Sequence, residues 1–180
     1  LLLCDCQLAF PGCSPFERAN ALLLKGDALK AVSPPRQEEA GQCIREAVAL
    51  TEHERPRTSM DAEIYPHALI HLGEHLCHAE QDFEGAIDAL TTVLGIYDTR
   101  YKFGELPDRF AAAQILSQIG SAYCGIDQRT GGAEQKAQCL WFCNQSILVF
   151  RKALEEHIRF RPASAEPIFR NAASVYHYYK

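Results

Sequence analysis

The sequence predicts an all-α fold: about three helical hairpins stacked as a solenoid, followed by a C-terminal capping helix. Apolar residues recur at helical spacing along most of the chain, most clearly over residues 69–94. Proline and glycine separate these stretches. Gly26, Gly73 and Gly120 repeat at an interval of 47 residues, each in the first helix of a predicted hairpin.

Residues with helix-capping or helix-breaking character mark the expected ends of the helices along the chain. Ser14 and Pro15 suit the N-cap and first position of a helix. Thr58 and Asp61 have the spacing of a capping box, and Asp82 suits an N-cap. Pro66 is expected to kink or split its helix, because its ring clashes with the carbonyl four residues back. The predicted helices cover residues 15–32, 35–54, 59–80, 83–101, 107–124, 133–160 and 164–180.

The chain divides into three parts on this basis. Residues 1–14 form an N-terminal extension or the end of a preceding helix, residues 15–161 form the three hairpins, and residues 162–180 form the capping helix. The third hairpin is expected to have a long loop over residues 124–132. The chain does not begin with Met, so a processed form and a segment of a longer protein both stay open.

Composition limits the possible classes of function. The 180 residues are 47% hydrophobic and 23% charged, which is typical of a globular chain. A net charge of −5 argues against a nucleic-acid-binding surface. No apolar run reaches the roughly 20 residues that a transmembrane helix needs.

The cysteines favour a reducing compartment over a disulfide framework. Five of the eight fall inside helical apolar patterns, where cysteine acts as a small hydrophobe. We therefore expect an intracellular location, in the cytosol or inside an organelle. Cys4, Cys6 and Cys13 lack a fourth zinc ligand nearby, and Cys139 and Cys143 suit core positions one helical turn apart.

Four histidines form the most conspicuous polar pattern. His67, His71, His75 and His78 fall within about 80° of arc on a helix, with Glu74 beside them. Imidazoles one turn apart can bind zinc, copper or nickel, but no second helix offers a further ligand. A metal- or pigment-binding protein stays an alternative; we expect no metal and no cofactor.

The chain carries no recognisable catalytic motif. It has no nucleophile elbow, no phosphate-binding glycine loop and no dinucleotide fingerprint. Paired carboxylates such as Glu38 and Glu39 suit exposed helix positions. We therefore expect that the protein is not an enzyme.

The three aligned hairpins resemble the tetratricopeptide repeat (TPR) family. Each glycine is preceded four residues earlier by an aliphatic residue and followed three residues later by a large apolar one. These residues are Leu22, Leu69 and Leu116, then Leu29, Leu76 and Tyr123. The period exceeds the usual repeat of about 34 residues, so the chain looks more like the long-helix variety of kinesin light chains and related scaffolds.

The resemblance implies that the first helices line a concave groove. Carried over position by position, the groove residues are Asn20, Leu23, Asp27 and Lys30; then His67, Ile70, Glu74, Cys77 and His78; then Gln114, Ser117, Ser121 and Cys124. Leu23 and Asp27 replace the basic clamp by which some members hold chaperone tails, so that ligand is not expected. The histidines would make binding pH-sensitive, because imidazole titrates near neutrality.

The predicted function is a non-catalytic scaffold that binds another protein. The ligand would be a peptide or helix with apolar anchors, with or without basic residues. The alternative is a permanent structural subunit of a larger assembly that uses its outer surfaces. Adjacent Trp141 and Phe142 cannot both face one core, which keeps this alternative open.

Overall fold

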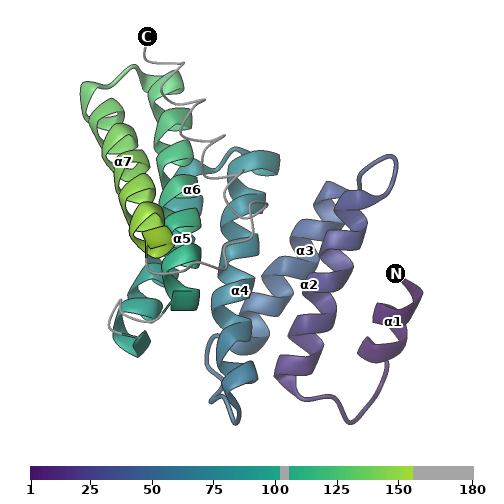
Figure 1. The fold of residues 1–180 in the computed structure, drawn as a ribbon. Helices are drawn as coiled ribbons and strands as arrows, with labels where there is room; N and C mark the ends of the chain where they lie inside the picture. Colours follow the sequence, from purple (N-terminus) through teal and green to yellow (C-terminus); the bar gives the residue numbers. More distant parts are fainter. Residues whose placement is uncertain (102–105, 156–180) are drawn as a thin grey trace. The chain divides into compact units, whose positions relative to one another are not determined.

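A computed structural model describes residues 1–101 and 106–155, and all regular structure in this part is helical (Figure 1). The prediction of an all-α protein is confirmed. The elements are α1 (Leu2–Leu8), α2 (Pro15–Ala31), α3 (Gln37–Thr51), α4 (Ser59–His75), the π-helical turn η1 (Leu76–Glu80), α5 (Phe83–Tyr101), α6 (Leu106–Thr130) and α7 (Ala133–Glu155).

The chain separates into two compact units. The N-terminal unit is Leu1–Ala79 and the C-terminal unit is Glu80–Lys180. The middle predicted hairpin, residues 69–94, has one helix in each unit, so its packing as one repeat stays a prediction. The predicted capping helix, residues 162–180, lies outside the described residues.

The helix starts predicted at Ser14, Thr58 and Asp82 are confirmed. The Ser14 hydroxyl accepts the Glu17 N–H at 3.2 Å, and the Glu17 carboxylate accepts the Ser14 N–H at 2.8 Å. Thr58 and Asp61 form the same reciprocal pair at 3.0 Å in both directions. Asp82 accepts the Gly85 N–H at 3.0 Å. Each bond satisfies an N–H group that has no partner inside its own helix.

One expectation about helix continuity is wrong, and a second is narrowed. Of the two outcomes expected at Pro66, a kink or a split, the split is excluded, since α4 runs unbroken from Ser59 to His75 with Pro66 buried inside it. The long loop predicted over residues 124–132 is wrong, because α6 continues to Thr130 and only Gly131 and Gly132 connect it to α7. Ile126 and Asp127 are buried, so tertiary packing favours the helix here.

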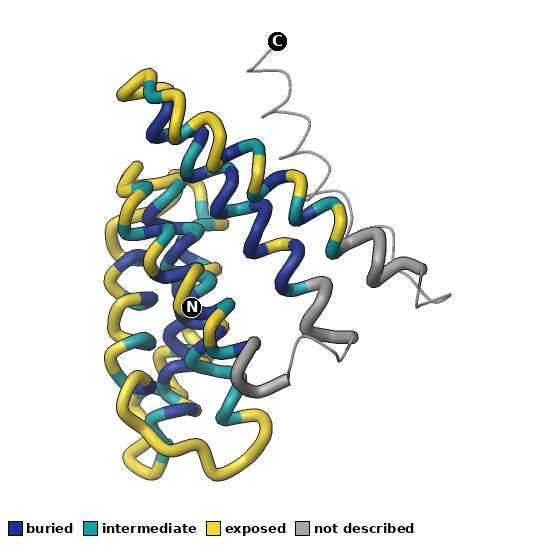
Figure 2. Tube along the Cα trace, turned by 90° about the vertical axis from the view of Figure 1, so that its left-hand side faces the viewer, coloured by how far each residue is buried: buried dark blue, intermediate teal, exposed yellow. Residues whose placement is uncertain are grey.

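The N-terminal unit is built on the pair α2 and α3, with α1 and α4 packed against it. Its core joins residues of α2, α3 and α4, namely Ala19, Leu22, Leu23, Ile44, Ala47 and Ala68. Figure 2 shows buried and exposed segments alternating along the helices of the described chain, as expected when each helix buries one face.

The C-terminal unit is built on α6 and α7, with α5 packed on α6. A Cβ added to Gly120 would lie 2.6 Å from the Cys143 Sγ, so α7 approaches α6 closely only because residue 120 is glycine. The buried Ser146 donates its hydroxyl to the Ala113 carbonyl at 2.6 Å, which satisfies its polar atom inside the core.

Candidate functional site

The candidate site lies in the N-terminal unit, where α2 packs beside α4. The Asp27 carboxylate of α2 lies 3.3 Å from Nδ1 of His71 on α4. The same carboxylate lies 3.7 Å from the Lys30 ammonium, one turn along α2. We call the surface around these three side chains the α2–α4 face.

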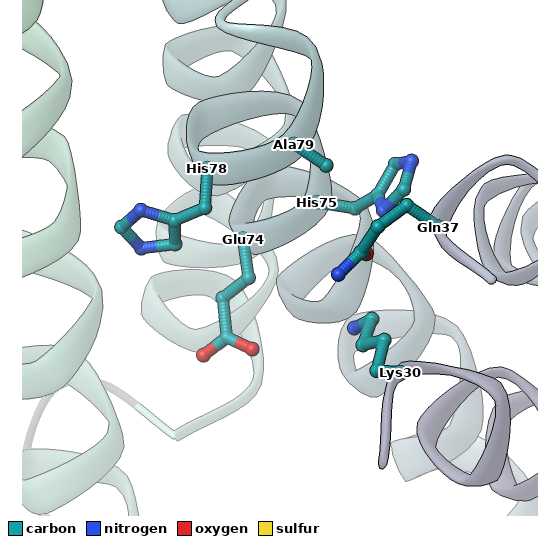
Figure 3. Close-up of a pocket in the computed structure, with 6 residues that line it drawn as sticks. All are labelled: Lys30, Gln37, Glu74, His75, His78 and Ala79. Carbon is teal, nitrogen blue, oxygen red and sulfur yellow. The ribbon is translucent and has the colours of Figure 1, made fainter. Parts of the chain in front are cut away.

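A pocket of about 470 Å³ opens at the C-terminal end of this face. Its lining comes from the ends of α2 and α4, the start of α3 and the turn η1. In Figure 3, Lys30 and Gln37 lie on one side of the pocket, and Glu74 and His78 lie on the other. His75 and Ala79 complete the lining.

The π-helical turn belongs to the pocket wall. The α-helical hydrogen-bond pattern of α4 ends at His75, and η1 carries His78 and Ala79 to the pocket. The turn is followed by Gln81, whose φ of 57° lies in the left-handed region. Single π-helical turns are frequent at functional sites because they change the direction of the side chains they carry.

His75 is a structural residue as well as a lining residue. Its side chain is only 3% exposed and packs against α3. A Cβ on Gly41 would lie 2.3 Å from the His75 Nε2, so this glycine makes room for the ring. A helix rotates His75 by about 80° from His67, which turns it away from the exposed edge and toward α3.

The four histidines therefore do not share one environment. His67 and His78 are exposed, His71 contacts Asp27, and His75 is buried. Among the residues that the structure describes, no group of three or more His, Cys, Asp or Glu side chains is arranged to hold a metal ion.

The predicted groove residues of the N-terminal unit differ in their accessibility. Asn20, Asp27, His67 and His78 are exposed, whereas Lys30, Ile70, Glu74 and Cys77 are half-buried. Burial raises the pKa of Cys77 to about 11, so this thiol is neutral at physiological pH. Leu23 is only 4% exposed and belongs to the core, so its predicted groove position does not fit the structure.

The third set of predicted groove residues lies on α6, in the C-terminal unit. Gln114 is exposed and Ser121 is half-buried. Ser117 and Cys124 are buried, at 2% and 8% exposure, and so offer a ligand no accessible side chain. Cys124 instead packs with cysteines of α7.

Three residues of the pocket are absent from the predicted groove: Gln37, His75 and Ala79. Gln37 begins α3, outside the first helices to which the family resemblance points. Ala79 lies one helical turn beyond His75, and that spacing is the only signal in the sequence that links the two. His75 was identified as a histidine of the stripe, but its burial depends on Gly41 of another helix.

The lining of the pocket is mixed in charge and in hydrogen-bonding groups. It combines one ammonium, one carboxylate, two imidazoles and one amide in a volume typical of ligand pockets. These groups include hydrogen-bond donors, hydrogen-bond acceptors and side chains that can form ion pairs.

The chain matches no model of a known protein family, and no curated protein matches it. In the described part of the chain, no helix combines the length and the apolar character needed to cross a membrane.

Proposed function

We propose that this protein is a non-catalytic interaction module that binds a peptide or helix of another protein on the α2–α4 face. The observation that carries the proposal is the pocket of about 470 Å³. It brings together Lys30, Glu74 and His78, which the TPR resemblance assigned to the groove from two different repeats.

The TPR-like solenoid is part of the same proposal. In the first hairpin, the residues nearest to Gly26 are Ile44 and Ala40 of α3. In the last hairpin, the residues nearest to Gly120 are Cys143 and Cys139 of α7. In both hairpins the glycine of the first helix thus meets two residues that lie four positions apart on the second helix, which supports a repeated hairpin.

The charges of the face favour a ligand with both polar and apolar groups. Lys30 is balanced by Asp27, so the face has no basic clamp for a terminal carboxylate. Glu74 and the imidazoles can accept hydrogen bonds from basic or amide groups of a peptide. All eight cysteines are thiols and not members of disulfides, which fits a reducing compartment.

The experiment compares two double variants in affinity capture followed by mass spectrometry. Glu74→Lys with His78→Asp changes the pocket, and Glu54→Lys with His53→Asp makes the same charge changes at exposed residues away from it. Circular dichroism first checks that both variants are folded. We expect a partner that the control retains and the pocket variant loses.

A peptide from that partner is then titrated into the labelled protein and followed by NMR. Shifts at Lys30, Gln37 and Glu74 support the proposal. A partner that binds the pocket variant as tightly as the control contradicts it. Equal affinity of the peptide at pH 5.5 and 7.5 contradicts the pH dependence alone.

The second candidate, a permanent structural subunit, is favoured by the outer side of α7. Trp141 is 53% exposed and Leu148 is 55% exposed. Phe142 instead stacks on Tyr123 with ring centroids 5.5 Å apart. Loss of the partner in Trp141→Ser, with retention in the pocket variant, would favour this candidate.

A further inference from the structure

Three cysteines meet inside the C-terminal unit. Cys124 of α6 packs with Cys139 and Cys143 of α7, and Tyr123 and Leu140 pack around them. The three residues are 8%, 0% and 1% exposed. The cluster exists because Gly120 lets α7 approach α6, with the Cys139 carbonyl 3.4 Å from the position of a Cβ on Gly120.

Cys139 is the central member of the cluster. Its thiol is hydrogen-bonded to Cys124 on one side and to Cys143 on the other. Gln128 also donates to the Cys124 sulfur at 3.6 Å. Burial raises the pKa of Cys124 to about 11, whereas the hydrogen bond from Cys139 lowers the pKa of Cys143. An anion in this cluster therefore belongs to the pair on α7.

We propose that Cys124 and Cys139 are a redox-sensitive pair that forms a disulfide between α6 and α7 when the protein meets a peroxide. The two residues belong to the same buried cluster, on facing helices, and a hydrogen bond joins their side chains. Cys139 and Cys143 cannot form the bond instead, because one turn of helix separates their Cβ atoms by about 5–6 Å. A disulfide needs Cβ atoms roughly 3.5–4.5 Å apart.

The chemistry balances with hydrogen peroxide as the oxidant. Removal of one proton from the Cys139–Cys143 pair creates one thiolate. The proton of the Cys139 thiol then passes to Cys143 along their hydrogen bond, and the Cys139 sulfur, which now carries the charge, attacks a peroxide oxygen. The O–O bond breaks, leaving a sulfenic acid on Cys139 and a hydroxide that takes up the proton. The Cys124 sulfur attacks the sulfenic sulfur, the S–O bond breaks, and water leaves. Two thiols and one peroxide become one disulfide and two waters.

Burial sets the expected behaviour of the pair. The exposed Cys6 should react with external reagents long before the cluster does. The bond would close a loop of about 15 residues around the turn at Gly131, which restricts the unfolded chain. We therefore expect the oxidised protein to be more stable, with the melting temperature raised by roughly 5 to 10 °C.

The test uses the full chain. Accessible thiols are blocked with N-ethylmaleimide under native conditions, hydrogen peroxide is added, and the protein is denatured, digested and mapped by mass spectrometry without reductant. We expect a linked peptide pair containing Cys124 and Cys139 that has lost two hydrogen atoms. Dithiothreitol should restore both thiols and reverse the rise in melting temperature.

Cysteine-to-serine variants test whether Cys124 and Cys139 are the two residues that form the disulfide. Cys139→Ser should abolish the linked peptides and the rise in melting temperature, whereas Cys77→Ser, a half-buried thiol of the N-terminal unit, should leave both unchanged. Cys124→Ser, at the more accessible end of the cluster, gives the same test if Cys139→Ser does not fold. Intact thiols at Cys124 and Cys139 in peroxide-treated wild type, or a bond mapped to another pair, would overturn the proposal.

Discussion

At the residue scale, two buried glycines of the N-terminal unit show how differently one residue type can be constrained. A Cβ on Gly26 would meet its nearest atom, Ile44 Cγ1, at 3.4 Å, which is an ordinary contact. A Cβ on Gly41 would lie 2.3 Å from the His75 Nε2. Only Gly41 is required by close packing, although the sequence repeat points to Gly26.

We expect Gly41→Ala to destabilise the protein by about 1–3 kcal/mol, because the added methyl group forces the buried His75 ring to move. Gly26→Ala is the matched control and should be neutral or stabilising by up to about 1 kcal/mol, since alanine favours helices. Urea denaturation measures both. Equal unfolding free energies for the two variants would contradict the packing argument.

The ionisation of Glu17 makes the stability of the start of α2 depend on pH. The Ser14 N–H, and after it the Ser14 hydroxyl, hold the pKa of Glu17 below its usual range. A lowered pKa means that the carboxylate stabilises the fold at neutral pH and that this contribution is lost as the pH falls through the folded-state pKa.

We expect Ser14→Ala to raise the pKa of Glu17 only part of the way toward its usual range, because the backbone N–H of residue 14 remains a hydrogen-bond donor. Carboxyl NMR titration of both proteins measures the change. A wild-type midpoint at or above that of an exposed glutamate would show that the capping box does not hold in solution.

At the scale of the element, the turn between α6 and α7 depends on one backbone conformation. Gly131 has a φ of 66°, which side-chain-bearing residues adopt at a cost. Its N–H still bonds to the Asp127 carbonyl at 2.7 Å, so the helix end and the turn form together.

Gly131→Ala should therefore destabilise the C-terminal unit by about 1 kcal/mol. Gly95 lies inside α5 with nothing within 4 Å of an added Cβ, so Gly95→Ala should stabilise by about 0.5–1 kcal/mol. Thermal unfolding followed by circular dichroism compares the two. Shifts of the same sign would contradict the assigned turn conformation.

At the scale of the whole molecule, the division at Ala79 and Glu80 assigns the candidate site to one unit. All residues of the pocket, and all residues of the core cluster that α2, α3 and α4 share, belong to Leu1–Ala79. The site then needs no residue of the C-terminal unit.

A fragment of residues 1–79 should fold alone, with reduced stability because a small unit buries a smaller share of its surface. We expect a helical circular dichroism spectrum and a cooperative urea transition. NMR shifts of Lys30 and Glu74 should match those of the full chain. A fragment without a cooperative transition would show that the core of this unit is insufficient.

Much of the secondary structure follows from local chemistry that the sequence states directly. Ser14, Thr58 and Asp82 are short acceptors placed three residues before the N–H groups they bind, so these helix starts could be predicted without tertiary information. The helical period likewise predicts the buried faces at Leu22, Leu29 and Leu69. Local spacing is sufficient to predict these helix starts, because the N–H donor and the side-chain acceptor lie within one helical turn of each other.

Tertiary packing decided three features that the spacing of residues along the sequence does not predict. Leu23 lies next to the predicted stripe, yet it is buried because α3 and α4 cover that side of α2. The segment 124–130 has a glycine that suggests a loop, yet it is helical: a Cβ on Gly125 would lie 2.3 Å from the Phe83 ring, which occupies that space. The pocket depends on Gln37, Glu74 and the π-helical turn meeting from three elements. The sequence alone determined the all-α class and the helix starts at Ser14, Thr58 and Asp82, because those depend on neighbours along the chain. The extent of α6 and the site were decided in three dimensions, because their contacting residues become neighbours only when the helices pack.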